Sequence, residues 1–208
     1  MNNLTVSARE IVKNFNRRAV LRNISFHVSS GESLAVTGKN GSGKSTLVKI
    51  VCGLLTPTSG VVGYECDGAA WSIDIMRRSL GLVSPYLQLY DEFSASENLT
   101  IISTIRNNVH PSADRAGELL RQFSLWDRRN DPVRTFSSGM KQRLKYVAAL
   151  LHDPTLLVVD EPTANLDDEG TEAVRAVFSS QLARGVLLVA TNDEREAGWC
   201  MKRIHVGL

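Results

Sequence analysis

Apolar residues recur along the chain at two spacings, and each spacing predicts one kind of element. Three N-terminal stretches that are rich in Val, Ile and Phe and partly alternating predict β-strands: Leu4–Val12, Ala19–Val28 and Ser33–Val36. Leu80–Val83 predicts a further strand. Leu156–Asp160 and Val186–Ala190 are continuous apolar runs, which is typical of strands buried on both faces of a parallel sheet.

Between several of these strands, apolar residues recur at the spacing of a helix. Apolar residues repeat at helical intervals from Leu47 to Leu55, directly after a glycine-rich segment. Helical patterns also cover Glu97–Asn107 and Ser112–Trp126. One face of another helix, beginning near Ser137, carries Met140, Leu144, Val147 and Leu151. The chain therefore predicts an α/β fold in which a helical segment interrupts the series of strands.

Composition narrows the class of protein. The 208 residues are 43% apolar and 22% charged, which fits a single soluble globular domain. The net charge of +2 is spread along the chain, so nucleic acid is not expected as the main partner. Cys52, Cys66 and Cys200 are isolated, which favours reduced thiols in a cytoplasmic protein. Because no apolar run approaches about 18 residues and the N-terminus lacks a leader pattern, neither a membrane span nor an export signal is expected.

The segment GKNGSGKS matches the phosphate-binding pattern G-x-x-x-x-G-K-(S/T) between a predicted strand and a predicted helix. Glycines allow backbone N–H groups to converge on a phosphate at the positive end of the helix dipole. Lys44 is expected to bridge the β- and γ-phosphates, and Ser45 to offer its hydroxyl to Mg²⁺. The alternative is a glycine-rich turn beside a surface lysine. The residues expected to bind the nucleotide here are Gly38, Lys39, Asn40, Gly41, Ser42, Gly43, Lys44, Ser45 and Thr46.

Two adjacent carboxylates close the apolar run that ends at Asp160. Neighbouring side chains on a strand point to opposite sides, so Asp160 and Glu161 are expected to have different tasks. Asp160 can hold Mg²⁺, and Glu161 can orient or deprotonate an attacking water. The alternative is a strand that leaves the core for a solvated turn.

A third segment, FSSGMKQR, opens a predicted helix. Ser137 is a good N-cap, and small residues at a helix N-terminus can form an anion site. An ordinary helix cap would explain Ser137, but it would not explain why Ser138 and Gly139 are both small.

Together, GKNGSGKST, FSSGMKQR, LLVVDEPTANLD and LLVATND resemble the nucleotide-binding subunit of an ATP-binding-cassette (ABC) transporter over nearly the whole chain. The resemblance implies a P-loop NTPase fold, with a RecA-like, mostly parallel sheet flanked by helices, an N-terminal antiparallel β subdomain and an inserted helical subdomain. It implies one ABC ATPase domain over 1–208. The nucleotide-binding core would span 1–85 and 146–208, and the helical subdomain with the signature segment would span 86–145.

The same resemblance implies an ATP-sandwich dimer, in which the signature segment of one subunit closes over the nucleotide held by the other. Ser137 and Gly139 would contact the γ-phosphate of the partner's ATP, and Asp167 would lie at the dimer seam. Phe15 occupies the place of the aromatic residue that stacks on adenine, with a core or hairpin aromatic as the alternative. The second subunit is expected to be another copy of this chain, although an unlike cassette stays open.

Two positions depart from the family pattern. Pro85 stands where the family has Gln, so either Gln88, three residues later, takes the role of touching Mg²⁺ and the attacking water, or that role is unfilled. Asn192 stands where the family has a His that contacts the γ-phosphate, and Asn can donate a hydrogen bond but no positive charge or proton. A compact cassette without that Gln also resembles the haem-exporter type used in cytochrome c maturation.

The expected function is ATP hydrolysis, with ATP and Mg²⁺ as ligands, that drives a separately encoded integral membrane permease. The chain would then be cytoplasmic and peripheral on the inner face of the cell membrane. Five apolar or aromatic residues are candidates for docking the permease, with core packing as the alternative: Tyr86, Leu87, Leu89, Tyr90 and Phe93. The alternative function is an ATP-dependent dimerisation module with little hydrolysis, which Asn192 and Pro85 would favour. A chromosome-maintenance ATPase would need a long heptad insertion that the sequence lacks.

Overall fold

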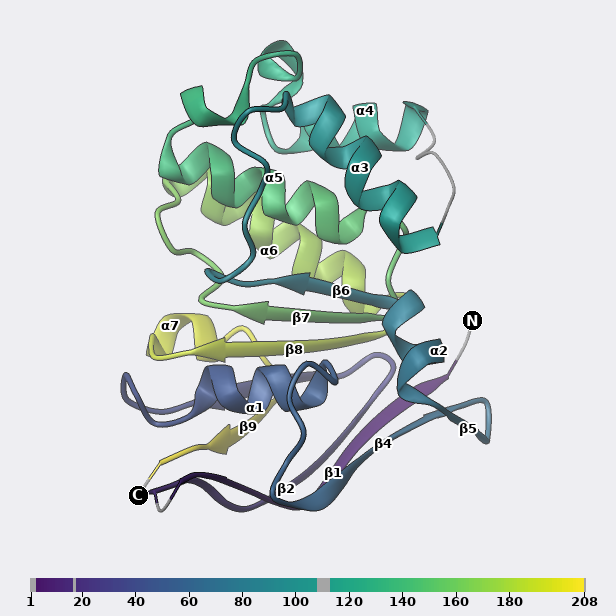
Figure 1. Cartoon of the computed structure of the whole chain (residues 1–208), viewed down its shortest axis with the longest axis vertical. Coiled ribbons are helices and arrows are strands. Elements are labelled where there is room, and N and C mark those ends of the chain that lie inside the picture. The colour runs from purple at the N-terminus through teal and green to yellow at the C-terminus, as the bar shows by residue number, and fades with distance from the viewer. Residues whose placement is uncertain (1–2, 17, 108–112, 208) are drawn as a thin grey trace.

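The structure is a computed structural model that describes residues 3–16, 18–107 and 113–207, and it contains two sheets with helices around them (Figure 1). The strands are β1 Leu4–Phe15, β2 Arg18–Ser29, β3 Ser33–Thr37, β4 Ser59–Cys66, β5 Ala69–Trp71, β6 Leu80–Val83, β7 Leu156–Asp160, β8 Val186–Thr191 and β9 Lys202–His205. The α-helices are α1 Lys44–Val51, α2 Ile73–Arg78, α3 Ala95–Asn107, α4 Ala113–Gln122, α5 Ser138–Leu150, α6 Asp168–Leu182 and α7 Glu194–Ala197. Short 3₁₀ turns cover Trp126–Arg128 and Val133–Thr135.

The central sheet has five parallel strands in the order β6-β7-β8-β3-β9. Every residue of β3, β7 and β8 is buried, as the continuous apolar runs predict. Strand β3, which leads into the glycine-rich segment, lies between β8 and β9. The C-terminal ends of these strands therefore meet at one edge of the sheet, where ligands bind in open α/β folds.

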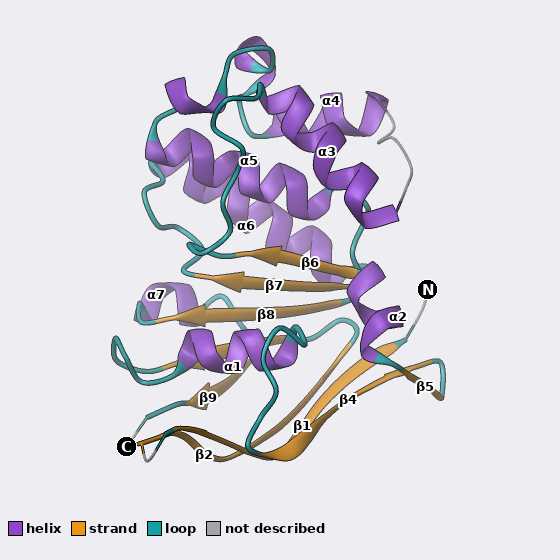
Figure 2. Ribbon diagram, in the orientation of Figure 1, coloured by secondary structure: helices purple, strands orange, loops and turns teal. Residues whose placement is uncertain are grey.

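Alternation along the parallel strands divides the core into two layers. Leu156 and Val158 of β7 pack with α1 and the antiparallel sheet, whereas Leu157 and Val159 pack with the helices α3 to α6. Figure 2 shows the same arrangement, with α3 to α6 on one side of the parallel strands and the antiparallel sheet on the other.

The antiparallel sheet has the order β2-β1-β4-β5 and is built on the long hairpin of β1 and β2. Its apolar side contributes Leu4, Val6, Ile11 and Leu21 to the core that α1 shares. The predicted α/β fold, with an antiparallel N-terminal sheet and helices around a mostly parallel sheet, is therefore confirmed.

Two helices end earlier than the sequence pattern predicts. Helix α1 stops at Val51, because Gly53 adopts φ +66° and turns the chain away from the helix axis. Glycine is needed there, since an added Cβ would lie 2.3 Å from the Ile73 side chain. Helix α4 ends at Gln122, and Trp126 starts a separate 3₁₀ turn. The predicted start of this helix, Ser112, lies outside the described residues.

Candidate functional site

The phosphate-binding segment forms a curled loop between β3 and α1. Gly38, Gly41 and Gly43 all have positive φ, at +149°, +78° and +106°. A Cβ on Gly38 would lie 2.1 Å from the carbonyl oxygen of Val206, which follows β9, so no larger residue fits there. The loop therefore needs glycine both for its backbone conformation and for its close approach to the end of β9.

Lys44, the first residue of α1, points back into the loop. Its ammonium Nζ donates hydrogen bonds to the carbonyl oxygens of Gly38 at 2.8 Å and Lys39 at 3.2 Å. Lys44 is 7% exposed, so its charge is concentrated inside the curl of the loop. A buried ammonium inside a curled glycine loop at the start of a helix is suited to binding phosphate oxygens.

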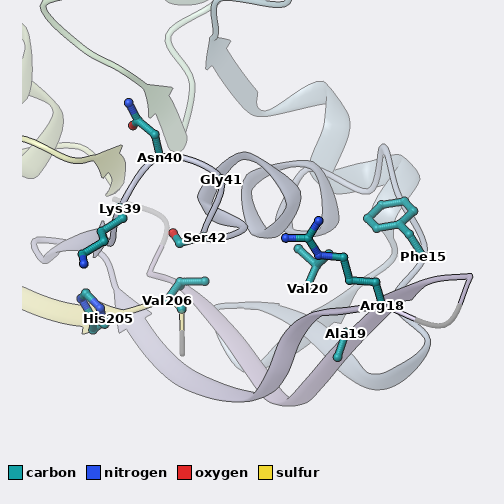
Figure 3. A pocket seen from close by; sticks show the side chains of 11 residues that line it. Phe15, Arg18, Ala19, Val20, Lys39, Asn40, Gly41, Ser42, His205 and Val206 are labelled. Atoms are coloured by element: carbon teal, nitrogen blue, oxygen red, sulfur yellow. The ribbon is translucent and has the colours of Figure 1, made fainter.

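A cavity of about 630 Å³ opens beside this loop (Figure 3). One end is lined by Lys39, Asn40 and His205, and the other end reaches Phe15 in β1. The Phe15 ring is 45% exposed, and the Lys13 ammonium lies 5.1 Å from its centre. Loop and aromatic ring thus share one cavity, which is large enough for a nucleotide.

Asp160, at the end of β7, lies beside the start of α1. Burial raises the pKa of its carboxyl above the usual value, and a hydrogen bond with the Ser45 side chain partly offsets this effect. The carboxylate is 1% exposed, and its Oδ1 is buried with no hydrogen-bond partner. An orphaned carboxylate oxygen next to a serine hydroxyl is the kind of hard oxygen donor set that Mg²⁺ prefers, so the residues present fit this ion.

Glu161 follows Asp160 directly but has a different environment. Its backbone has φ +56°, and its N–H donates to the carbonyl oxygen of Ala190 at 2.9 Å. The side chain is exposed, whereas Asp160 is buried. The two carboxylates are therefore separated into one buried and one solvent-facing group.

Asn192 lies next to the phosphate-binding loop. Its side-chain Nδ2 donates to Oδ1 of Asn40 at 2.9 Å. Both residues line a second cavity of about 380 Å³, together with Gly38, Glu194 and His205. The structure thus brings together the loop after β8 and the loop after β3.

The signature segment begins α5. Ser137 is its N-cap, and its hydroxyl accepts from the Met140 N–H at 3.2 Å. A Cβ on Gly139 would lie 2.6 Å from the carbonyl oxygen of Asn165, so the segment packs against the loop after β7. Arg143 of α5 is ion-paired with Asp167 of that loop. Neither Ser137 nor Gly139 lines the cavity beside the phosphate-binding loop of its own chain.

Gln88 lines a separate apolar groove of about 370 Å³, together with Leu54, Tyr90 and Lys145. It is not among the residues that line the two cavities beside the phosphate-binding loop. Lys145 of α5 donates to the carbonyl oxygens of Ser84 at 3.2 Å and Pro85 at 3.4 Å, and burial lowers its pKa. Its ammonium anchors the start of the segment that contains Gln88.

One buried polar residue in this region has no sequence signal. Glu196 is 6% exposed and accepts hydrogen bonds from Thr163 and Thr191, which lie beside Glu161 and Asn192 in the sequence. In the sequence, Glu196 belongs to a short polar stretch after a strand, and nothing there indicates a buried residue. Its partners Thr163 and Thr191 come into contact with it only in the folded chain. Only the tertiary structure identifies this residue.

Within 3–16, 18–107 and 113–207, no helix combines the length and the apolar character needed to cross a membrane. The same residues contain no cluster of three His, Cys, Asp or Glu side chains that could hold a metal ion by themselves.

A curled glycine loop between a parallel strand and a helix, with a buried lysine and a neighbouring aspartate, defines a P-loop nucleotide-binding protein. The family model described as "ABC transporter" matches residues 21–164. The chain belongs to this family, and it is the nucleotide-binding domain of an ABC transporter, an ATPase.

Relatives with curated descriptions agree with this assignment. The lantibiotic transport ATP-binding protein SrtF of Streptococcus pyogenes is 33% identical over 184 residues, which cover 88% of this chain and 78% of that protein. The lipoprotein-releasing system ATP-binding protein LolD 1 of Chlorobium chlorochromatii is 32% identical over 199 residues, covering 91% of this chain and 81% of that protein.

Solved structures share the fold over almost the whole chain. The structure of an ATP-binding subunit of an ABC transporter has a TM-score of 0.84 at 28% identity, covering 97% of this chain and 85% of that one. A dimeric ATP-binding cassette in a post-hydrolysis state, bound to ADP and Pi, has a TM-score of 0.84 at 24% identity, covering 97% of this chain and 94% of that one.

Proposed function

We propose that this chain hydrolyses ATP in a dimer of cassettes and thereby drives a separately encoded membrane permease. The observation that carries the proposal is the buried Asp160 carboxylate beside Ser45, with one oxygen unpartnered, next to a loop that encloses the Lys44 ammonium. A loop that only bound a phosphate would not need a desolvated carboxylate facing it. The added carboxylate supports a metal–nucleotide complex as the ligand.

The proposed roles follow from this placement. The loop amides and Lys44 bind the β- and γ-phosphates, and Phe15 stacks on the adenine. Ser45 and Asp160 hold Mg²⁺, which would neutralise charge on the phosphate oxygens. Glu161 faces solvent and orients the attacking water in line with the γ-phosphate, and Asn192 donates a hydrogen bond to that phosphate. Gln88 as a further Mg²⁺ ligand stays a prediction, because in this structure it lines the apolar groove.

A second cassette completes the nucleotide site in this proposal. Ser137 is exposed and Gly139 lies in the first turn of α5, and neither contributes to the cavity of its own chain. The N-terminus of α5 is therefore available to an ATP held by another subunit, which we propose to be a second copy of this chain. Asp167, held by Arg143, lies beside it and would approach the seam.

The membrane permease is proposed to dock on the apolar groove that contains Gln88. Leu87 and Tyr90 line the groove and are partly exposed, and Tyr86 and Phe93 are exposed on the same segment of the chain. Lys145 and Arg77 also line the groove. The proposed location is accordingly the cytoplasm, peripheral on the inner face of the cell membrane. Residues 86–145 act in this proposal as the helical subdomain that connects the permease to the core formed by 1–85 and 146–208.

A second candidate function is a nucleotide-dependent dimerisation module with little hydrolysis. It is favoured by Asn192, whose amide donates to Asn40. This amide can supply neither a positive charge nor a proton to the γ-phosphate. The solvent-facing Glu161 argues for hydrolysis.

Steady-state ATP hydrolysis by the purified chain over a wide range of protein concentration separates the two functions. The Glu161→Gln variant serves as the blank, since it keeps the size of the side chain and removes the base. A specific activity that rises with concentration and is lost in the variant is expected for a dimeric ATPase. Activity equal to the blank, with ATP still bound, would favour the dimerisation module, unless adding the permease restores turnover.

A further inference from the structure

Glu196 is a buried carboxylate whose two oxygens both have partners. It lies on the short helix α7 and is 6% exposed. Oε1 accepts from the Thr163 backbone N–H at 3.2 Å and from the Thr163 hydroxyl. Oε2 accepts from the Thr191 hydroxyl. One side chain thus joins the loop after β7 to the end of β8.

These two partners flank the residues proposed to act on the γ-phosphate. Thr163 is two residues after Glu161, and Thr191 directly precedes Asn192. The Thr191 hydroxyl also accepts from the Asp193 N–H at 2.9 Å, so it fixes the backbone on the other side of Asn192. The carboxylate therefore sets the distance between the two loops.

The signature helix is tied to the same loop. Tyr146 of α5 is fully buried, and its hydroxyl donates to the carbonyl oxygen of Pro162 at 2.8 Å. Pro162 lies between Glu161 and Thr163. The hydrogen bond from Tyr146 of α5 therefore holds one residue of this turn, and the hydrogen bonds to Glu196 of α7 hold the next.

Glu161 needs such support because its backbone is in the left-handed region, at φ +56°. This conformation is strained for a non-glycine residue, which keeps it only where its surroundings impose it. A buried carboxylate also loses its hydration, which strong hydrogen bonds must offset. An apolar side chain in place of Glu196 would avoid this desolvation, so the retained charge is better explained by the geometry it imposes than by stability.

We infer that Glu196 is a positioning residue that holds the Glu161 turn and the Asn192 loop in a fixed relation, so that both side chains meet one γ-phosphate. The inference rests on the proposed function, because it acts through the roles given there to Glu161 and Asn192. Glu196 itself touches neither the nucleotide nor the attacking water.

The test compares Glu196→Ala and Glu196→Gln with the parent chain in steady-state hydrolysis and in equilibrium binding of a fluorescent ATP analogue. Glu196→Ala is expected to lower kcat by about tenfold to a hundredfold, the loss expected of a misplaced catalytic group, while the affinity for the analogue changes by less than about twofold. Glu196→Gln keeps one acceptor oxygen and is expected to recover part of kcat. Glu172→Ala removes an exposed carboxylate of α6 and serves as the matched control with parental kcat.

Thr191→Val removes the hydrogen bond to Oε2, and Thr163→Val removes the hydroxyl hydrogen bond to Oε1 but keeps the backbone one; both provide the test should Glu196→Ala fail to fold. Each is expected to lower kcat less than Glu196→Ala does. In addition, Glu196→Ala should cost less in an Asn192→Ala background, because residues that act as one unit are not additive.

The outcomes separate the inference from the proposed function. A parental kcat in Glu196→Ala or in both valine variants, while Glu161→Gln is inactive, overturns the inference alone. An equal loss of affinity and kcat, which a purely structural role predicts, also overturns it. Full hydrolysis by Glu161→Gln would instead remove the proposed role of Glu161, and the inference with it.

Discussion

The side-chain amide of Asn192 donates a hydrogen bond of 2.9 Å to the side-chain oxygen of Asn40. This contact joins the loop after β8 to the phosphate-binding loop after β3, and both residues border the same cavity. Any movement of the Asn192 loop is therefore coupled to the loop that encloses Lys44.

Replacing Asn192 by His is expected to raise turnover several-fold. An imidazole can carry a positive charge and donate to the γ-phosphate, whereas an amide cannot carry charge. The measurement is kcat for ATP hydrolysis with saturating Mg²⁺, with Asn192→Ala as the variant that loses the hydrogen bond to Asn40. A flat or reduced rate in Asn192→His would show that the asparagine is adapted to its contact with Asn40.

Replacing Asp160 by Asn is expected to stabilise the chain without ligands. Burial raises the pKa of Asp160 in the folded state, so its favourable contribution is fully present below the unfolded pKa and is lost as the pH rises through the folded pKa. At neutral pH the buried charge destabilises the fold, and the neutral amide removes that cost. Each kcal/mol recovered should raise Tm by about 2–4 °C for a chain of this size.

Thermal unfolding at pH 7 without nucleotide or Mg²⁺ checks this expectation. The Tm difference between Asp160→Asn and the parent should shrink as the pH is lowered, because the parental carboxyl then becomes neutral too. Asp160→Asn should also lose Mg²⁺-dependent hydrolysis. A lower Tm for the variant across this pH range would contradict the assigned cost of the buried charge.

Replacing Gly139 by Ala is expected to destabilise the chain. The new Cβ would lie 2.6 Å from the backbone oxygen of Asn165, and a backbone atom cannot move aside cheaply. Such overpacking costs about 1–3 kcal/mol, more than the roughly 1 kcal/mol that alanine gains over glycine in a helix.

The control for this change is Ser138→Ala, at the neighbouring exposed position of α5. It should change the free energy of unfolding by less than about 0.5 kcal/mol. Urea titrations of both variants give the comparison. Equal stability of Gly139→Ala and the parent would mean that the Asn165 loop moves freely relative to α5.

Replacing Tyr90 and Phe93 together by Ser is expected to release the chain from membranes that contain its permease. The two rings lie 6.0 Å apart in an edge-to-face pair and are both partly exposed. Ile105→Ser, at a 73% exposed position of α3, removes a comparable apolar surface elsewhere and should leave co-sedimentation unchanged. Unchanged co-sedimentation of the double variant would exclude this docking surface.

Much of the fold could be predicted from local pattern. The continuous apolar runs of β7 and β8 and the glycine spacing of the phosphate-binding loop each depend on few neighbouring residues, and the structure has these elements. Strand β4 carries a weaker signal, because most of its residues are exposed or half-buried and it is held by pairing with β1. Helix α6, capped by Asp167, lies in a stretch with fewer apolar repeats.

The site residues likewise fall into those that a local motif predicts and those that only tertiary contacts identify. Lys44 and Asp160 follow from motifs, because their chemistry requires fixed positions in the sequence. Glu196 and Lys145 do not, since their roles depend on hydrogen bonds to the backbone or side chains of other elements. The role of Gln88 could not be assigned from its distance to Pro85 in the sequence alone. Its position in the groove depends on the path of the whole segment from Ser84.

The strand order has a consequence for how the chain folds. Strand β3 ends at Thr37, but its two neighbours in the sheet are β8 and β9, which begin at Val186 and Lys202. During synthesis, β3 and its loop leave the ribosome long before either neighbour exists, whereas the β1–β2 hairpin can form at once. The backbone carbonyl of Val206, which lies against Gly38, is made later than β8 and β9. The phosphate-binding loop can thus reach its final surroundings only after β8 and β9 have been made, so nucleotide is expected to bind only molecules in which the parallel sheet has formed around β3.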